Sequence, residues 1–579
     1  MKYILTIAFL AAVSVAVAQK KVVNEEINIT KEREVSVPKA TKLTEKIPQT
    51  QAPVTEKKMN YSFFDRKPTG IEEVEFNPNV IPPLDKSKNR EDVLGFDNYL
   101  KLGAGNYGRL YGELFINSSQ DRKFVYGLSA LHNSTRKGPV DSRLSGQALT
   151  KIGVDGKYHQ NTYEVRLNAG YENRGYHFYG YDTTANFDYT KTDLRQRLNL
   201  YSFAATIENT RPKSKIDYKL STGVYALNDF YDASELDWGT QLNTFFPIFE
   251  DKIKAVINAE AYVTQMSDSR TENSTRKRNL FRIEPAFNFD FGSFSARVGL
   301  KAVSQSDPVI NSSIAKAYPT ATLTYKTPSL VYFFAGVDGD IVRNTMRSLL
   351  NENPWLIEQI SNGAASKNYI RNTYKNLDVF LGARGDLFSG VSFNVKGSYG
   401  KYQDLYYFDQ YDGSTFSPGG KPLNVTKFDV VYDEEEIDFV NGSLELGYSG
   451  FDVWKPVLKV DYNYYGKGTF EKPLHRPAVS ARLGNTITLT DRLVSSVDFY
   501  YIGGIFARQT GAMNGEYNPN QPIVKLKDIV DLNAEFTYLF TDHFAAFVKL
   551  NNIVGKNYQR YYNYPQLGLN FLAGINIAL

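Results

Sequence analysis

The most regular feature of this chain is a two-residue alternation of apolar and polar side chains that recurs along most of its length. It is clearest in residues 215–226, 252–263, 528–540 and 567–579. In residues 252–263, for example, Ile, Ala or Val occupies every second position, opposite a face that carries Lys254. Successive side chains of a strand point to opposite faces, so each stretch has one apolar and one polar face. The pattern predicts β-strands, and helical periodicity is almost absent.

The final stretch, residues 567–579, predicts how the strands are arranged. Its odd positions are apolar, whereas its even positions are mostly small or carry amides. One face of such a strand suits lipid and the other suits a polar interior. A strand at the end of a membrane chain must still pair on both edges, which requires a barrel that closes on a first strand near residues 98–105. The predicted lipid-facing residues are Leu567, Leu569, Phe571, Ile575, Ile577 and Leu579.

The connections between the predicted strands are alternately short and long. Tight turns, such as those near residues 159–160 and 291–292, alternate with long polar segments, such as 174–193, 340–370 and 409–435. Outer-membrane barrels have short periplasmic turns and longer extracellular loops in the same way. The sequence therefore predicts an all-β fold, a transmembrane antiparallel β-barrel of about 22 strands with both termini periplasmic. The segment 340–370 carries the one helical pattern, so we expect either a short helix there or a plain packed loop.

Composition agrees with a membrane barrel. The chain has 41 Tyr and 37 Phe among 579 residues, yet its mean hydropathy is −0.39. Aromatic girdles around a polar lumen give this combination, and a soluble β-sandwich array or propeller is the alternative. The absence of Cys excludes disulfides and thiolate metal sites. The net charge of +4 is small for this length and predicts no nucleic-acid partner.

The chain divides into three parts. Residues 1–18 have Lys2, an apolar run and a small-residue site ending at Ala18, as in a secretory signal peptide. Residues 19–96 predict an extended periplasmic or luminal segment, because the first forty or so contain no aromatic residue and cannot bury much apolar surface. Residues 97–579 form the predicted barrel. We therefore expect a protein of the outer membrane of a Gram-negative cell.

The C-terminal run resembles the end of a TonB-dependent receptor barrel. It carries FVKLNNI at 547–553, KNY at 556–558, YP at 564–565 and then Gly568 before the closing strand. The opening strand near residues 98–108 also looks like that of plug-poor members of this family. The resemblance covers about residues 97–579 and implies a receptor barrel whose strand number agrees with the count above.

Two features depart from the family. A complete receptor has a globular plug before its barrel, and residues 19–96 are too few for a complete plug. The nearest match to the family's energy-coupling segment is Glu26–Thr30, a five-residue stretch that arises easily by chance. The resemblance therefore implies a receptor-like wall and leaves coupling to TonB open.

The polar faces of the strands supply candidate lumen residues. A Lys or Arg facing lipid at the membrane midplane costs about 2–4 kcal/mol, so charged faces must point inward. These side chains could line a solute path, or could form ion-paired ladders along the wall and with residues 19–96. We favour the ladders, because a wide barrel without filling would leak. The candidates are Arg109, Glu113, Asp217, Lys219, Lys254, Glu260, Lys459 and Asp461.

Other chemistry is sparse. One acidic run could bind Ca²⁺ through clustered carboxylates or could form a solvated loop base. The five His residues lie far apart with no metal-ligand spacing, and no catalytic arrangement or phosphate-binding loop is present, so we expect no enzyme and no cofactor. The residues of the acidic run are Asp433, Glu434, Glu435, Glu436 and Asp438.

Two functions fit these observations. The first is transporter-like passage of a solute across the outer membrane, with residues 19–96 partly occluding the lumen. The alternative is a non-catalytic scaffold or accessory barrel subunit of a larger outer-membrane complex for assembly, secretion or nutrient capture. The expected partners are outer-membrane lipid and other outer-membrane or periplasmic proteins, which residues 19–96 and the external loops would contact. No nucleic-acid partner is expected.

Overall fold

A computed structural model of the chain describes the barrel region. The described residues are 98–118, 123–184, 188–211, 214–249, 252–268, 275–307, 312–328, 331–357, 370–387, 390–411, 415–451, 453–509 and 522–578. The predicted signal peptide, residues 19–96 and the end residue Leu579 lie outside them.

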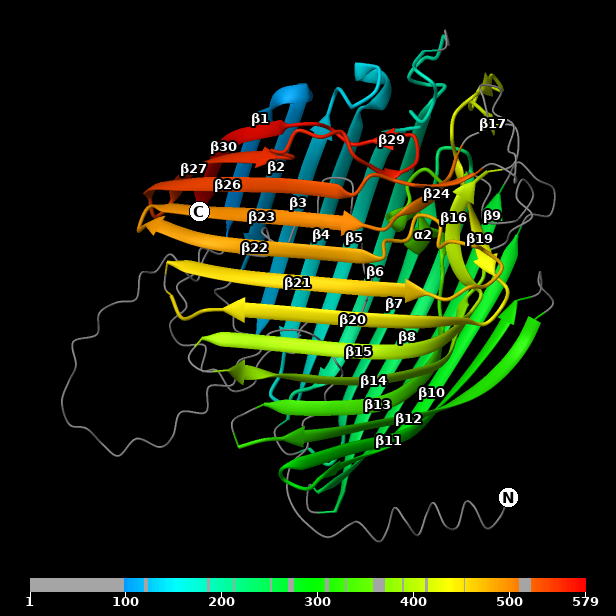
Figure 1. Cartoon of the computed structure of the whole chain (residues 1–579). Helices are drawn as coiled ribbons and strands as arrows, with labels where there is room; N and C mark the ends of the chain where they lie inside the picture. The colour runs from blue at the N-terminus through cyan, green and yellow to red at the C-terminus, as the bar shows by residue number, and fades with distance from the viewer. Residues whose placement is uncertain are drawn as a thin grey trace.

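Twenty-two of the described strands form one closed antiparallel sheet, as the alternation and the turn pattern predict (Figure 1). The first strand pairs with the second and also with the last, so the sheet closes into a barrel. The wall strands are β1 (Tyr99–Gly105), β2 (Arg109–Asn117), β3 (Phe124–Thr135), β4 (Gln147–His159), β5 (Tyr163–His177), β6 (Arg195–Asn209), β7 (Asp217–Asn228), β8 (Ala233–Phe249), β9 (Ile253–Asp268), β10 (Arg276–Asp290), β11 (Phe294–Asp307), β12 (Ser312–Lys326), β13 (Tyr332–Val342), β14 (Thr373–Leu387), β15 (Val391–Gln403), β20 (Ile437–Tyr448), β21 (Trp454–Tyr465), β22 (Val479–Thr490), β23 (Leu493–Gly503), β26 (Ile529–Thr541), β27 (Phe544–Asn551) and β30 (Asn570–Ala578).

The long connections lie at one end of the barrel, which we call the long-loop end, and carry the remaining elements. The helical pattern becomes the short helix α2 (Met346–Glu352), which confirms a helix in the β13–β14 connection. Among the described residues, no helix is long and apolar enough to cross a membrane. The other elements are the 3-10 turns η3 (Asn106–Gly108) and η4 (Ser142–Ser145) and the strands β16 (Leu405–Gln410), β17 (Thr415–Phe416), β18 (Pro422–Leu423), β19 (Phe428–Asp433), β24 (Phe506–Arg508), β25 (Ile523–Lys525), β28 (Gln559–Tyr561) and β29 (Tyr564–Pro565).

The two faces of the wall have opposite chemistry. On β26, Phe536, Tyr538 and Phe540 are exposed on one face, whereas Asp531 and Glu535 are buried on the other. The same division recurs around the sheet, where large apolar residues are exposed and Lys, Arg, Asp and Glu are buried. An exposed apolar face this extensive is unfavourable in water and suits lipid.

The barrel closes where β1 meets β30, with help from inward side chains. The ladder is tight, because a Cβ on Gly105 or Gly574 would lie 1.9 Å from a backbone carbonyl oxygen of the opposite strand. On the inner side, Lys101 Nζ lies 2.7 Å and Lys549 Nζ 3.8 Å from the carboxylate of Glu535. All three side chains are at most 10% exposed, so the closure depends on both close backbone approach and a buried ion cluster.

One of the predicted lipid-facing residues, Leu567, does not lie on the closing strand. The closing strand begins at Asn570 rather than at 567, and Leu567 lies in the preceding loop with only 7% of its surface exposed. Its carbonyl accepts a hydrogen bond from the Asn552 side chain at 2.8 Å, which holds the loop against the end of β27. The apolar alternation continues into this loop although the strand does not. The other described members of the set either are exposed (Leu569, Phe571) or lie further along the same face of β30 (Ile575, Ile577).

Candidate functional site

Long connections from several sides of the barrel pack into one buried cluster, which we call the loop cap. It draws on the β5–β6, β7–β8, β13–β14, β15–β20 and β27–β30 connections and on the strand ends next to them. A cluster of this size makes the connections one packed unit rather than separate solvated loops. Its central residues include Phe178, Tyr179, Leu194, Tyr231, Met346, Leu349, Trp355, Leu356, Phe408, Phe428, Tyr561 and Tyr564.

The loop cap spans the mouth of the barrel, because its connections start on opposite walls. Around the ring, eight strands (β7 to β14) separate the β5–β6 connection from the β15–β20 connection on one side, and ten (β21 to β4) on the other. The two connections nevertheless touch: Thr426 N donates to the Gly180 carbonyl at 2.8 Å. Lys427 Nζ lies 4.4 Å from the centroid of the Phe178 ring. The loop cap therefore covers the lumen at the long-loop end.

Trp355 lies at the centre of the loop cap. Its ring stacks on Tyr564 with centroids 4.1 Å apart. The rings of Tyr179 and Tyr561 meet it edge to face, with centroids 5.7 and 5.8 Å from its own. Its backbone carbonyl accepts from Phe428 N at 3.0 Å. One side chain thus joins three connections of the loop cap.

Helix α2 fixes the Trp355 segment to the wall. Thr345 caps the helix by accepting from Ser348 N at 3.0 Å. The carboxylate of Glu235 on β8 accepts from Met346 N at 2.7 Å and from Arg347 N at 3.0 Å. Free N–H groups at a helix start carry partial positive charge, so the carboxylate is well placed there. The loop cap is therefore anchored to β8 and cannot move as a loose loop.

His475, from the β21–β22 connection, is buried beside the loop cap. Its Nδ1 lies 2.7 Å from the Phe408 carbonyl oxygen, so it carries the proton and donates; Nε2 accepts from Tyr562 N at 3.3 Å. Burial, together with the nearby Arg560 guanidinium, lowers the pKa of His475 from 6.5 to about 3, although the hydrogen bond to Phe408 opposes the shift. A second ring proton would face the Tyr562 N–H, so the site fits only neutral histidine.

The wall of the lumen below the loop cap carries paired charges. The Arg282 guanidinium of β10 bonds to Glu260 on β9 and lies 2.7 Å from Asp340 on β13. Lys301 on β11 lies 2.8 Å from Asp338. Charges on β9, β10, β11 and β13 therefore neutralise one another across the inner face of the wall. The partners of Glu260 come from strands whose register the sequence does not reveal.

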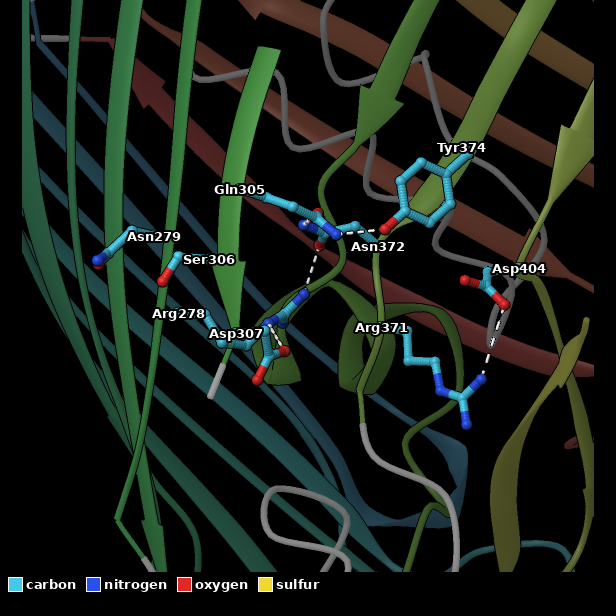
Figure 2. Close-up of a pocket in the computed structure, with 9 residues that line it drawn as sticks. All are labelled: Arg278, Asn279, Gln305, Ser306, Asp307, Arg371, Asn372, Tyr374 and Asp404. Atoms are coloured by element: carbon cyan, nitrogen blue, oxygen red, sulfur yellow. Dashed lines mark hydrogen bonds and ion pairs between the residues drawn. The ribbon is translucent and has the colours of Figure 1, made fainter. Parts of the chain in front are cut away.

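A second polar cluster lies higher on this wall (Figure 2). Arg278 reaches Asp307 at 3.2 Å, and the Asn372 amide donates to Gln305 at 2.9 Å. Gln305 in turn donates to the hydroxyl of Tyr374. Figure 2 shows these side chains converging from β10, β11 and the start of β14. They tie the segment that enters β14 to the inner face of β10 and β11.

Three predicted lumen residues lie on the polar faces of β2 and β7 with local partners. Arg109 Nη1 donates to Asn570 Oδ1 at 3.0 Å, which links β2 to the closing strand. Glu113 accepts from two tyrosine hydroxyls at 2.8 and 2.5 Å. Asp217 accepts from the Asn209 amide at 2.8 Å. The Glu113 and Asp217 contacts tie neighbouring strands together, and the Arg109 contact reaches across β1.

The remaining predicted lumen residues have weaker or looser surroundings. Lys459 and Asp461 on β21 are exposed, and Lys459 Nζ lies 3.6 Å from Glu445 on the neighbouring β20. Lys219 on β7 and Lys254 on β9 are half-buried on the polar face of their strands. Water thus reaches the β20–β21 sector of the wall more freely than the tightly paired β8–β14 sector.

The acidic run at the base of the β15–β20 connection does not form a cation site. Its carboxylates bind separate partners, and Glu435 is exposed. No group of three or more His, Asp or Glu among the described residues is arranged to hold a metal ion. The partners are Thr469 N for Asp433 (2.7 Å), Arg371 for Glu434 (3.1 Å), Lys401 for Glu436 (3.2 Å) and the Tyr399 hydroxyl for Asp438 (2.6 Å).

The sequence reading missed the loop cap. It treated the long connections as polar loops, although they are rich in aromatic residues, including YHFYGY at 176–181 and YQRYYNYP at 558–565. Aromatic side chains in such numbers bury large apolar areas and rarely stay in water. Aromatic density within loops was the available signal for a packed external structure.

The fold is similar to that of several solved structures. The siderophore receptor PirA from Acinetobacter baumannii matches with a TM-score of 0.61 and 14% identity over 83% of this chain and 80% of that one. The ferric-catecholate import receptor Fiu from E. coli K12 has a TM-score of 0.60 and 10% identity, over 83% and 81% of the two chains. The copper transporter OprC has a TM-score of 0.59 and 12% identity, over 83% and 80%.

No similarity was found at the level of sequence families. A scan against protein-family models and a search of curated proteins both found no match. At 10–14% identity, the likeness to these receptors is one of fold. The closed 22-stranded sheet with its exposed apolar face supports a location in the outer membrane. The chain has the barrel fold of the TonB-dependent receptors.

Proposed function

We propose that this protein passes a solute across the outer membrane as a receptor-like transport barrel, with its long-loop end outside the cell and both termini in the periplasm. The single observation that carries the proposal is a charge-paired lumen wall whose mouth is covered by the loop cap. An open wide pore would leak whatever the barrel's function, so any such barrel needs a closed lumen. A cover at the mouth, rather than an apolar filling of the lumen, leaves a polar path that a solute can follow once the cover opens.

The matched receptors support the same class of function. They are named as a siderophore receptor, a copper transporter and a ferric-catecholate import receptor, so proteins with this barrel fold include transporters. Lys427 lies over the Phe178 ring and is only 2% exposed, so its charge would meet a polar or anionic solute only after the loop cap opens. Binding would occur at the loop cap, and passage would follow along the β20–β21 sector.

Conductance in planar lipid bilayers tests the proposal. The full chain is compared with a Trp355→Ala, Tyr564→Ala double variant, which loses the central stack of the loop cap, and with a further variant that also lacks residues 19–96. We expect little conductance from the full chain and stepwise pores from at least one variant. Trp454→Ala, on the outer face of β21, is the matched control and should behave like the full chain.

The scaffold function is the alternative, and the firm anchoring of the loop cap to β8 favours it. A rigid external surface is a suitable docking platform for other proteins. If all variants fold, as shown by heat-dependent gel mobility, and none conducts, the transport proposal fails. Purification in mild detergent with a stoichiometric partner would then support the scaffold.

A further inference from the structure

The wall is not continuous between β12 and β13. Strand β12 pairs with β11 along its length, from Ser312 to Tyr325. With β13 it pairs only from Ala321 to Lys326, in the half next to the short turns. Both strands are described throughout this region, and among the described residues only β11 pairs with residues 314–320 of β12. The ladder thus opens for seven residues toward the long-loop end.

Strands β12 and β13 separate because the end of β13, which stays paired with β14 as far as Val342, bends toward the inner face of the wall. Gly339 lies against the inward ring of Tyr318, so close that a Cβ on the glycine would be 2.4 Å from the ring. The guanidinium of Arg282 donates to the Ile341 carbonyl at 2.9 Å, and Arg278 donates to the Asn344 carbonyl at 2.9 Å. The end of β13 therefore runs inside β10 to β12 and toward α2. In Figure 1, the green strands around β11 and β12 splay away from β14 and β15 at this end.

The inner side of the opening is filled. Tyr318 and Ile341 belong to a buried cluster that also includes Leu280, Val303 and Tyr374. Lys316 on β12 spans to β14 with its side chain, because its Nζ lies 2.9 Å from Asn376 Oδ1 and 4.3 Å from the Tyr374 ring centroid. Anything that pairs with the β12 edge must therefore arrive from the outer face.

The outer face of the opening is small, apolar and set in the membrane. Ala315, Ala317 and Pro319 face outward on β12 and are exposed. A membrane-crossing strand takes about 9–11 residues, so a count from the outward Tyr325 near the short turns reaches Ala315. The free edge therefore lies largely within the lipid band, in the half nearer the loops.

A groove on the outer face leads to this edge. It has a volume of about 680 Å³ and runs over the outer side of β7 to β12. Rows of small residues line it, because Ala259 pairs with Leu242 and Ala302 pairs with Ala317 at its floor. A barrel wall is normally convex toward lipid, so a concave apolar strip beside an open edge provides a fitted contact surface.

An unpaired strand edge in lipid is unfavourable. Each backbone N–H or C=O without a partner in hydrocarbon costs several kcal/mol, and membrane barrels normally have no open edge for this reason. Acyl chains fill space but offer no donors or acceptors. A second copy in the same membrane would present its β12 in the same direction, and parallel pairing is the weaker kind.

We propose that the β12 edge at residues 314–320 is a docking site for an extended segment of a different outer-membrane protein, which adds one strand from the lipid side. The segment carries alternating apolar side chains, and those on its outer face contact the alanine-lined groove. Strand addition of this kind provides affinity through backbone hydrogen bonds and specificity through alternate side chains. This interaction surface is independent of the proposed transport function, which concerns the lumen and the loop cap.

Pro319 supplies a way to test the pairing itself. Proline has no N–H, and within a sheet it occupies positions whose nitrogen faces an open edge. Residues two apart on a strand direct their N–H groups to the same side, so the N–H of Ala317 also faces the edge. Ala317→Pro therefore removes a donor from the docking edge and leaves the ladder with β11 intact. Lys316→Pro is the opposite case, because it removes a donor from the β11 ladder.

The experiment uses the full chain in its own cells, with the photo-crosslinking residue p-benzoylphenylalanine at Ala315 or, in a second variant, at Pro319. Ala335, an exposed alanine in the paired half of β13, is the matched control position. Only chains with the heat-sensitive mobility of a folded barrel are scored. We expect adducts with one polypeptide, at two of its residues that are four apart, and no such adduct from Ala335. Ala317→Pro should lower the yield from Ala315 about tenfold, the effect of losing one edge hydrogen bond and adding a ring clash.

Several outcomes would overturn the proposal. They are adducts with lipid only, adducts with a second copy of this chain, adducts scattered along a partner without register, and an Ala315 yield that Ala317→Pro leaves unchanged in folded protein. A partner captured equally from Ala315 and Ala335 counts against it in the same way. Failure here leaves the conductance experiment unaffected, because that experiment depends on the lumen and the loop cap.

Discussion

Replacing Trp355 by Ala should open the loop cap while leaving the wall intact. Only 6% of the Trp355 surface is exposed, and its ring stacks on Tyr564 at 4.1 Å with two further aromatic edges beside it. Removing a buried Trp side chain costs about 3–5 kcal/mol, since the surrounding residues relax only partly. Tenfold in an equilibrium corresponds to about 1.4 kcal/mol, so the open population should rise about 140- to 3,700-fold.

Hydrogen exchange at individual amides measures this opening. Phe428 N bonds to the carbonyl of residue 355, and Thr426 N bonds to Gly180 across the mouth of the barrel. If the loop cap opens as one unit, both amides should lose protection by the same factor, because local stability is shared within a cooperative unit. Amides of the wall strands should keep their protection.

Two controls make the result decisive. Trp454 is 43% exposed on the outer face, so Trp454→Ala should leave exchange at Thr426 and Phe428 unchanged. Trp355→Phe keeps part of the stack and should fall between wild type and Trp355→Ala. Faster exchange at Phe428 alone would refute the reasoning, since the two connections would then move independently. Unchanged exchange at both amides would show that packing on Trp355 does not hold the loop cap closed.

Three further changes test other parts of the structure. The pKa of His475 is about 3 in the folded loop cap and 6.5 in model peptides. The loop cap should therefore be fully stable above pH 6.5 and lose about 2 kcal/mol of stability by pH 5. If acid speeds amide exchange in the loop cap of His475→Gln as much as in wild type, this prediction is wrong. Ile575→Lys should impair barrel assembly by about 2–4 kcal/mol in the lipid band and Asn576→Lys much less, so equal heat-modifiable fractions in gels would show that the face assignment is wrong. Glu535→Gln leaves two buried lysines without their shared carboxylate, so it should destabilise the closure by about 3–5 kcal/mol in thermal unfolding. Glu445→Gln, in the more exposed pair with Lys459, is the control and should change stability by less than about 1 kcal/mol.

The strands of the wall could be predicted from the sequence because the alternation that marks a strand is a local pattern. A strand shows its two faces within a few residues, as residues 252–263 do, and short and long connections mark every reversal of direction. The limit of the rule is visible at Leu567, where apolar alternation continues after the strand pairing has ended. Alternation reports which side chains would fit a strand and does not report where backbone pairing stops.

The loop cap and the β12 opening could not be read in the same way. Trp355 and Tyr564 stack although 209 residues separate them, and no local pattern in either segment points to the other. The inward bend of β13 depends on Arg278 and Arg282 reaching backbone carbonyls more than fifty residues away in sequence. Which charged side chains of the lumen pair with one another depends on strand register, which only the closed ring fixes.

The register at the closure also constrains how this chain can vary. Lys101 and Glu535 are 434 residues apart, yet they meet only when every intervening strand has its proper stagger, because the total stagger around a closed barrel is fixed. A two-residue slip in any one wall strand would be carried round the ring and would misalign Gly574 against β1. Insertions and deletions are therefore tolerable in the connections and not in the wall. Strands β1 and β30 can therefore pair in register only when every strand between them is present and correctly staggered.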